Sequence, residues 1–171
     1  EEIIDNRLKD PGMHFKDIII ILSESMENEA KFRDLAIDFD FRLGKDFYTT
    51  RHYYLMSIFR NLIMNAMDSI DSLSGKQKIS FVQEEYQEEF KFSIEDTGAG
   101  IKNEHLEFIF SPGFSTKVDY STGQINRGLG LSLVKDIVEE YLGGRINVAS
   151  KEGQGSIFTI FIPKKAIEVT G

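Results

Sequence analysis

Asn61-Leu62-Ile63-Met64-Asn65-Ala66-Met67-Asp68 lies inside a long helical pattern, and the other motifs of the chain are interpreted around it. Apolar residues recur at helical spacing and form one stripe along this pattern: Leu55, Ile58, Phe59, Leu62, Ala66 and Ile70. Asn61, Asn65 and Asp68 recur at i, i+4 and i+7 and form a second stripe, about 110° around the helix from the first. We therefore expect the polar stripe to border a cavity between the core and the solvent.

Neutral asparagine oxygens at such a border are suitable ligands for Mg²⁺, which prefers oxygen donors, keeps bound water and usually shares its coordination with phosphates. The same pattern also fits the polar flank of an ordinary amphipathic helix, and this stretch alone does not decide between the two interpretations. The glycine-rich stretches further along the chain favour a ligand site.

Composition limits the classes of protein that the chain can belong to. With 171 residues, 41% hydrophobic content and 14 Phe, the chain can bury one sizeable core, and we expect one compact domain. A net charge of -8 argues against a nucleic-acid surface, which would normally show a basic patch. The absence of cysteine excludes disulfides, zinc–thiolate sites and thiol catalysis.

The sequence gives no sign of a membrane span. Its longest aliphatic run, at 18–22, is far shorter than the roughly 20 residues that a membrane helix needs, and no secretory signal pattern opens the chain. We expect a soluble cytoplasmic domain. Because the chain begins at Glu1 without an initiator Met, we also expect a fragment of a longer protein, in which a transmembrane sensor could lie elsewhere.

Periodicity predicts helices and strands over most of the chain. We expect residues 1–14 to form a lead-in and residues 15–171 to form the domain. Helical patterns occupy 15–32, 50–73, 103–108 and 128–142. Strand patterns occupy 35–41, 79–86, 90–95, 145–150 and 156–162. Thr49 or Thr50 is the expected N-cap of the central helix, and Ser74-Gly75 is its expected end.

Asp96-Thr97-Gly98-Ala99-Gly100 follows a predicted strand, which is a favoured place for a binding loop. Because glycine lacks a Cβ, the backbone at Gly98 and Gly100 can approach a flat ligand closely. The Asp96 carboxylate can accept a hydrogen bond from an exocyclic amine, worth about 1.5–3 kcal/mol, and would thereby select adenine. An ordinary Asp-Gly turn explains the pentapeptide equally well.

Gly128 and Gly130 come just before a predicted helix, where backbone N–H groups and the positive helix end can hold phosphates. The third glycine position of a dinucleotide fingerprint holds Leu133, and no Gly-Lys-Ser/Thr follows, so neither a Rossmann site nor a P-loop is supported. Tight helix packing is the alternative use of these glycines.

Lys117 and Arg127 bracket a polar segment without periodicity, 113–127, which we expect to be a mobile lid. Both side chains are placed to meet a polyphosphate, although lysines in polar loops are usually only solvated. We assign no metal-binding or base role to the histidines, which show no paired spacing: His14, His52 and His105.

In order and spacing, these segments resemble the N, G1, F and G2 boxes of sensor histidine kinases. The matching segments are 61–65, 96–100, 110–117 and 128–131. The similarity covers residues 15–163 and ends in 155–163, which looks like the closing strand of the kinase ATP-binding domain. The sequences IFSPGFSTK and RGLGLSLV look most like the citrate and dicarboxylate sensor kinases.

The resemblance implies a Bergerat-fold α/β sandwich, with a mixed, mostly antiparallel sheet of about five strands and helices on one face. ATP would lie between the helices and the lid. By position, Asn65 would bind Mg²⁺, Asn61 would support the phosphates, and Asp96 would contact the adenine amine. Gly98 and Gly100 would shape the adenine pocket. The resemblance implies that Asn61 and Lys117 would be catalytic. It also implies further nucleotide-binding residues: Thr116, Lys117, Arg127, Gly128, Leu129, Gly130, Leu131 and Thr159.

Kinases of this type transfer the γ-phosphoryl group of ATP to a histidine in an H box on a separate helical dimerisation domain. None of the three histidines here lies in such a box, so we expect the catalytic ATP-binding domain alone. Its expected partners are the dimerisation domain and a response regulator of the full-length protein, which could be anchored in the inner membrane. We expect the isolated fragment to be monomeric.

The main alternative is an ATP-driven clamp, which resembles the gyrase, heat-shock chaperone and mismatch-repair branch of the same superfamily. Those ATPases carry a Glu four residues before the Mg-binding Asn, where it orients the attacking water. Here that position is Asn61, whose amide cannot act as a base at neutral pH. We therefore expect slow hydrolysis, whereas phosphoryl transfer depends mostly on positioning and electrostatics. A third interpretation is a nucleotide-responsive binding module without catalysis.

Overall fold

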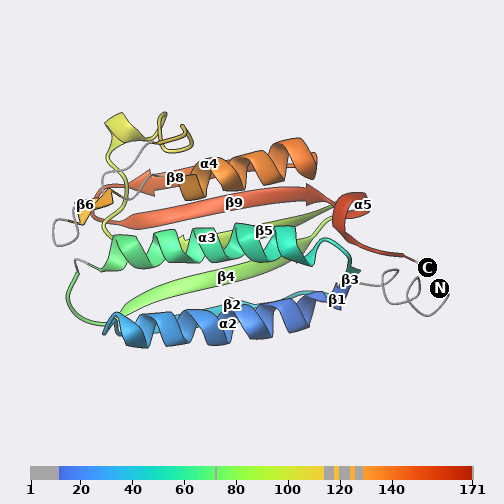
Figure 1. The fold of residues 1–171 in the computed structure, drawn as a ribbon, viewed down its shortest axis with the longest axis horizontal. Helices are drawn as coiled ribbons and strands as arrows, with labels where there is room; N and C mark the ends of the chain where they lie inside the picture. Colours follow the sequence, from blue (N-terminus) through green and yellow to red (C-terminus); the bar gives the residue numbers. More distant parts are fainter. Residues whose placement is uncertain (1–11, 72, 114–117, 120–123, 126–128, 171) are drawn as a thin grey trace.

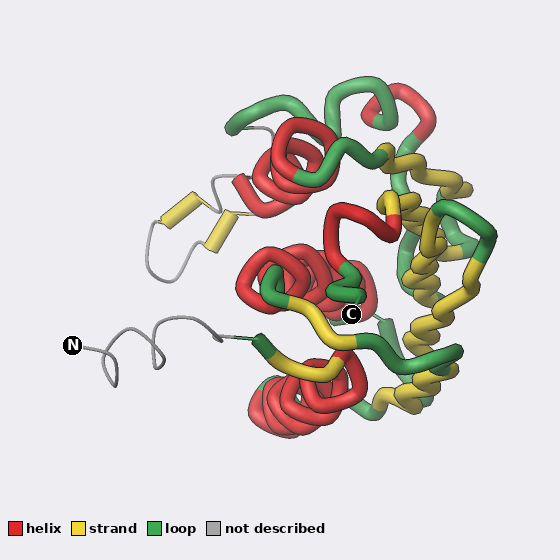
Figure 2. The backbone as a smooth tube through the Cα atoms, turned by 90° about the vertical axis from the view of Figure 1, so that its right-hand side faces the viewer, coloured by secondary structure: helices red, strands yellow, loops and turns green. Residues whose placement is uncertain are grey.

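A mixed β-sheet forms one layer of the molecule and helices form the other (Figure 1, Figure 2). The computed structural model describes residues 12–71, 73–113, 118–119, 124–125 and 129–170. Within these residues the sheet has five strands, in the order β2 (Ile37–Arg42), β4 (Gln77–Glu85), β5 (Glu89–Asp96), β9 (Gly155–Pro163) and β8 (Arg145–Lys151). Strand β2 runs parallel to β4, and the other neighbours are antiparallel. The predicted sandwich, with its mostly antiparallel sheet, is confirmed.

The helices cover one face of this sheet, with α3 (His52–Ile70) lying between α2 (Phe15–Phe32) and α4 (Leu129–Asp136) (Figure 1). Helix α4 continues as a wider π-helical turn, η2 (Ile137–Tyr141). Gly143 then adopts a positive φ of 68°, which ends the helix as its sequence predicted. Among the described residues, no helix combines the length and the apolar character needed to span a membrane.

The core forms between the apolar stripes of the helices and alternate residues of the strands. Phe59 of α3 meets Phe81 of β4 and Phe92 of β5, with ring centroids 5.0 Å apart in both pairs. All these rings are fully buried, and burial of such a side chain contributes about 1.5–3 kcal/mol. The predicted apolar stripe of α3 is buried in full: Leu55, Ile58, Phe59, Leu62, Ala66 and Ile70. This burial fixes which side of α3 the polar stripe occupies.

The predicted caps of α3 are wrong. The N-cap is Arg51, and Thr49 belongs to a short strand, β3 (Tyr48–Thr49). The Oγ1 atom of Thr49 accepts a hydrogen bond of 2.9 Å from the Arg51 N–H, so this threonine shapes the approach to the helix rather than its first turn. At the other end the C-cap is Asp71, before the expected Ser74-Gly75.

The last two residues of the predicted lead-in belong to a strand. Met13 and His14 form β1 (Met13–His14), which pairs with β3 in an antiparallel ladder. The short elements η1 (Asn103–His105), β6 (Val118–Asp119), β7 (Gln124–Ile125) and α5 (Lys164–Ile167) complete the described fold. The predicted lid falls largely on residues outside the described ranges, although Val118 pairs with Ile125 inside it.

Candidate functional site

Helix α3 contacts two of the predicted glycine motifs, the one at the start of α4 and the one in the loop after β5. Near its middle, Asn61 faces the first turn of α4, because a Cβ atom at Gly130 would lie only 3.0 Å from Asn61 Oδ1. Near its end, Ser69 packs against the loop that follows β5, because a Cβ atom at Gly98 would lie 2.3 Å from Ser69 Oγ. Asn61, Gly130 and the Asp96 loop (residues 97–101) are therefore brought to the same side of α3.

The two asparagines of the polar stripe have different surroundings. Asn61 is half-buried, and its Nδ2 donates a hydrogen bond of 2.7 Å to the Ser57 carbonyl oxygen one turn earlier. This bond orients the amide, so that Oδ1 is directed toward Gly130. Asn65 is also half-buried, and no hydrogen bond to its side chain is found among the described residues. Its carbonyl oxygen is therefore available to a cation or to water.

Asp68, the third member of the polar stripe, has a structural partner. Its Oδ1 lies 2.7 Å from Arg33 Nη1, and Arg33 Nε lies 3.0 Å from Glu29 Oε1. Partial burial of Arg33 opposes its charge, but hydrogen bonds and Coulomb attraction from Asp68 and Glu29 prevail and raise the pKa of the guanidinium. This ion pair joins the end of α2 to α3, so we do not include Asp68 in the candidate site.

Asp96 ends β5 and is only 3% exposed. Its Oδ1 accepts a hydrogen bond of 2.8 Å from the Gly98 N–H. Directly opposite Asp96, on β9, lies Ser156, which is 6% exposed. Because directly opposed residues in an antiparallel pair point to the same face, the carboxylate and the hydroxyl both lie on the helix-facing side.

The glycines of the Asp96 loop are required by packing against the protein itself. Gly100 has a φ of +73°, and a Cβ atom there would lie 2.3 Å from the Lys151 carbonyl oxygen. The Ala99 N–H donates to the Ser69 carbonyl oxygen at 3.0 Å, and the Gly153 N–H donates to the Ala99 carbonyl oxygen at 2.7 Å. The loop is thus held between α3 and the turn that joins β8 to β9, which gives one wall of the site a fixed shape.

Only part of the predicted phosphate-binding region lies in the described residues. Gly130 is placed against Asn61, and Leu131 is partly buried and packs against the core. Leu129 begins α4. The remaining predicted residues of this region lie outside the described ranges: Thr116, Lys117, Arg127 and Gly128. Before them, Phe110 packs edge-on against Phe158, with centroids 6.2 Å apart, and this contact anchors the start of the segment to the sheet.

Thr159 was predicted to bind the nucleotide, and the structure places it elsewhere. Phe158 and Ile160, its neighbours on β9, are fully buried on the helix-facing side. Because strand residues alternate between faces, Thr159 points to the opposite, open face of the sheet. Ser156, which the sequence reasoning missed, lies on the helix-facing side, opposite Asp96. The signal was its place at the start of the closing strand, but its pairing with Asp96 could not be read without the strand register.

Comparison with known families places the chain in a class. Residues 51–166 match the family described as histidine kinase-, DNA gyrase B-, and HSP90-like ATPase. The chain belongs to this family, since the match covers more than half of it. The predicted resemblance to the ATP-binding domain of sensor histidine kinases is also confirmed by individual relatives.

Sensor protein CitS of Bacillus subtilis (strain 168) is 37% identical over 112 residues, which are 66% of this chain and 19% of that protein. Sensor histidine kinase ZraS of Escherichia coli (strain K12) is 39% identical over 109 residues, 64% of this chain and 21% of that protein. The chain thus spans about a fifth of the length of these relatives. Because differently named kinases match equally well, the predicted kinase subgroup stays a prediction.

The structure is similar to a nucleotide-free catalytic domain of histidine kinase ThkA, with a TM-score of 0.71 and 26% sequence identity. The similar region covers 90% of this chain and 97% of that domain. Whereas the chain is much shorter than CitS and ZraS, it matches this single catalytic domain almost end to end. The fold described above is therefore that of a histidine kinase catalytic domain.

Proposed function

We propose that this domain binds Mg-ATP and donates the γ-phosphate to a histidine on a dimerisation domain outside this sequence, in two-component signal transduction. The observation that carries the proposal is the shared placement of Asn61, Gly130 and the Asp96 loop on one side of α3. The Asn61 amide and the start of α4 would suit the phosphate end of a ligand. The buried Asp96 carboxylate, further along α3, would suit its base end.

Asp96 and Ser156 would receive the base end. The Asp96 carboxylate is buried and accepts the Gly98 N–H, and its oxygens can only accept hydrogen bonds when ionised. Adenine offers an amine where guanine offers a carbonyl. Asp96 would accept a hydrogen bond from that amine, which would be worth about 1.5–3 kcal/mol. Gly98 and Gly100 contribute by allowing the loop to pack tightly on α3 and on the β8–β9 turn, which holds the pocket wall in place.

Asn65, Asn61 and Gly130 would hold the phosphate end. A half-buried amide without a hydrogen-bond partner among the described residues fits a cation that prefers oxygen ligands. Bound Mg-ATP would supply the phosphoryl group, with the cation neutralising charge on the phosphate oxygens. The N–H groups at the start of α4, together with the positive end of that helix, would favour the anionic phosphates. Lys117 and Arg127 remain proposed phosphate contacts.

The chemistry of Asn61 favours phosphoryl transfer over hydrolysis. Its Nδ2 is already bonded to the Ser57 carbonyl oxygen, and an amide cannot take a proton from water at neutral pH. The attacking water of a clamp ATPase would therefore lack its base at this position. Transfer to a positioned acceptor does not need that base, because positioning and charge stabilisation account for most of the catalysis.

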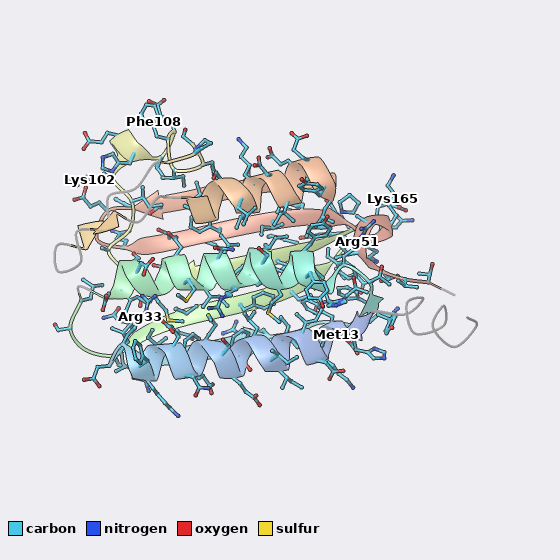
Figure 3. All side chains as sticks on the ribbon, in the orientation of Figure 1. Met13, Arg33, Arg51, Lys102, Phe108 and Lys165 are labelled. Atoms are coloured by element: carbon cyan, nitrogen blue, oxygen red, sulfur yellow. The ribbon has the colours of Figure 1, made fainter. Side chains whose placement is uncertain are left out.

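The proposed acceptor is a histidine on the dimerisation domain of the full-length protein, and the proposed next partner is a response regulator. Figure 3 shows Met13 and Arg51, the sequence neighbours of His14 and His52, at the end of the molecule opposite Lys102, which follows the Asp96 loop. Those two histidines therefore lie far from the candidate site. We further propose that the domain works in the cytoplasm, whether or not the full-length protein is anchored in the inner membrane.

The proposal is tested by mixing the chain with the separately expressed dimerisation domain of its own full-length protein and γ-labelled ATP. We expect label on the dimerisation domain when Mg²⁺ is present and none when the metal is removed with EDTA. Release of inorganic phosphate without protein labelling would instead support the clamp. Nucleotide binding with neither reaction would support a binding module.

A further inference from the structure

We infer that Ser150 is a positioning residue for the base end of the nucleotide site, although it lies two strands away from Asp96. Its hydroxyl fastens the end of the Asp96 loop and orients the hydroxyl of Ser156. The inference rests on the proposed function, because it specifies how the same site discriminates and holds its base.

The side chains of Asp96, Ser156 and Ser150 form a row across the sheet. Ser156 on β9 is paired with Asp96 on β5 and with Ser150 on β8. Since directly opposed residues of antiparallel strands share a face, all three lie on the helix-facing side. On β4 the next member of the row is Ile79, which is apolar. The polar side chains of the row are therefore confined to β5, β9 and β8, beside the Asp96 loop.

The Ser150 hydroxyl is surrounded by three partners. It lies 2.9 Å from the Gly155 carbonyl oxygen, 2.8 Å from the Ile101 backbone nitrogen and 2.8 Å from Ser156 Oγ. A hydroxyl has one hydrogen to donate and two lone pairs. The carbonyl oxygen can only accept and the backbone N–H can only donate, so the Ser150 hydrogen goes to Gly155 and Ser156 must be the donor in the serine pair.

This assignment has two consequences for the base end of the site. The Ser156 hydrogen is directed toward Ser150, so Ser156 presents its oxygen lone pairs, an acceptor suited to an amine, on the side of Asp96. At the same time Ile101, the last residue of the Asp96 loop, is tied to β8. The start of the loop is tied to Lys78 on β4 by Thr97, and its middle is tied to Ser69 and Gly153 by Ala99. Ser150 therefore fixes the end of the loop, which neither Thr97 nor Ala99 holds.

Replacement of Ser150 by alanine removes an acceptor from Ile101 and a partner from Ser156. The Ser156 hydroxyl can then rotate and present its hydrogen to the amine of the base, which is unfavourable. The phosphate end should be unaffected, because Asn61, Asn65 and Gly130 are on α3 and α4. We expect the Kd for Mg-ATP, and the KM for ATP in transfer to the supplied dimerisation domain, to rise about three- to tenfold. The kcat at saturating ATP should not change.

The test compares the unmodified chain with Ser150→Ala, Ser150→Thr and a control, Ser93→Ala, which removes a hydroxyl from the open face of β5. Calorimetry gives the Kd for Mg-ATP, transfer assays give KM and kcat, and hydrogen exchange reports the Ile101 amide. We expect faster Ile101 exchange and weaker ATP binding in Ser150→Ala, recovery in Ser150→Thr, and no change in Ser93→Ala.

Unchanged affinity and unchanged Ile101 exchange in Ser150→Ala would overturn the inference. A fall in kcat with KM unchanged would also overturn it, since that pattern indicates loss of folded enzyme or of the phosphate end. If the unmodified chain binds Mg-ATP but transfers no phosphate, the proposed function fails as a kinase while the Kd comparison still decides the role of Ser150. If it binds no Mg-ATP, both fail.

Discussion

Asp96 can be replaced by asparagine in a way that tests the base contact alone, because an amide oxygen can accept the same backbone hydrogen bond as the carboxylate. In Asp96→Asn the side-chain oxygen can still accept the Gly98 N–H at 2.8 Å, so the loop should keep its shape. The second position becomes an NH₂ group facing the adenine amine, and two donors then oppose each other. We expect ATP binding to weaken by more than tenfold. Calorimetry with ATP and GTP measures this, with Asp38→Asn, on an exposed position of β2, as the control.

Equal affinity of the unmodified chain for ATP and GTP would contradict the assignment of Asp96, because adenine and guanine differ at the group that the carboxylate is proposed to read.

Asn65 provides a test of the metal position that leaves the core untouched. The residue is half-buried beside the apolar stripe, and surface substitutions usually change the free energy of unfolding by less than about 0.5 kcal/mol. In Asn65→Ala we expect nearly unchanged stability, whereas phosphotransfer should fall by orders of magnitude because the cation stabilises the transferring phosphate. Thermal unfolding and transfer assays measure both quantities, and Asn147→Ala, at an exposed position of β8, is the matched control. A melting temperature lowered by many degrees with transfer per folded molecule preserved would identify a structural asparagine instead.

Gly130 tests the contact between α4 and Asn61. A Cβ atom there would lie 3.0 Å from Asn61 Oδ1, so Gly130→Ala should displace the amide by a few tenths of an ångström or more. Alanine is favoured over glycine in a helix by about 1 kcal/mol, so the fold should not suffer. We expect weaker Mg-ATP binding at unchanged or higher melting temperature, measured by calorimetry and thermal unfolding. Unaltered binding would show that the amide position is not important for the nucleotide.

At the scale of single residues, sequence reasoning predicted the faces on which the candidate residues lie better than the contacts that they make. Asn61, Asn65 and Asp96 could be predicted because helical spacing and a strand end determine their faces. Ser156 was missed and Thr159 was chosen because only the strand register decides which residue lies opposite Asp96. The physical reason for Gly98 was also incomplete, since its Cβ position is filled by Ser69 rather than left open for a ligand.

At the scale of elements, the sequence predicts most accurately the helices and strands that bury a continuous apolar stripe. Helix α2 spans Phe15–Phe32, as its apolar spacing predicted, because that stripe is buried along its whole length. The predicted N-cap of α3 was wrong because Thr49 belongs to β3, which pairs with β1, and a local capping pattern cannot anticipate that pairing. Strands of two residues, such as β1, are too short to show a hydrophobic period, and they form only by pairing with a partner strand.

Gln83 tests the attachment of the loop after β2 to the sheet. Its side chain is 5% exposed, accepts the Gly44 N–H at 3.0 Å and donates to the Lys45 carbonyl oxygen at 2.9 Å. Gln83→Ala leaves both backbone groups without this partner, which should lower the free energy of unfolding by roughly 2 kcal/mol. Denaturant unfolding measures this loss, and Gln87→Ala, in the exposed turn between β4 and β5, should show none.

Mg-ATP affinity should be the same in Gln83→Ala and in the unmodified chain, because Gln83 pairs with Phe92, four residues before Asp96 on β5. A large loss of affinity without loss of stability would mean that this loop communicates with the site in a way that the fold does not explain.

At the scale of the whole molecule, the two-layer arrangement places the candidate site along the helices rather than on the open face of the sheet (Figure 2). The Asp96 loop and η1 lie at one end of the layers, whereas Met13 and Arg51 lie at the other (Figure 3). A phosphate held near Asn61 and the start of α4 would lie about two and a half turns along α3 from His52, the first residue of that helix. His14, in β1, lies beyond that end of α3. The remaining histidine, His105 in η1, follows the Asp96 loop at the site end.

The position of the histidines leads to a prediction about the isolated chain, which concerns the whole molecule because it asks whether this fold can phosphorylate itself. His52 lies about two and a half turns along α3 from Asn61, and His14 lies in β1 beyond the start of that helix. His105, in η1, follows the Asp96 loop at the base end. We therefore expect no labelling of the chain alone by γ-labelled ATP, and labelling of a histidine on the supplied dimerisation domain. His105→Gln should leave that transfer intact, because a residue beside the base loop does not take part in positioning the γ-phosphate. Label on the chain itself that disappears in His105→Gln would contradict the prediction and would place a phosphoacceptor within this domain.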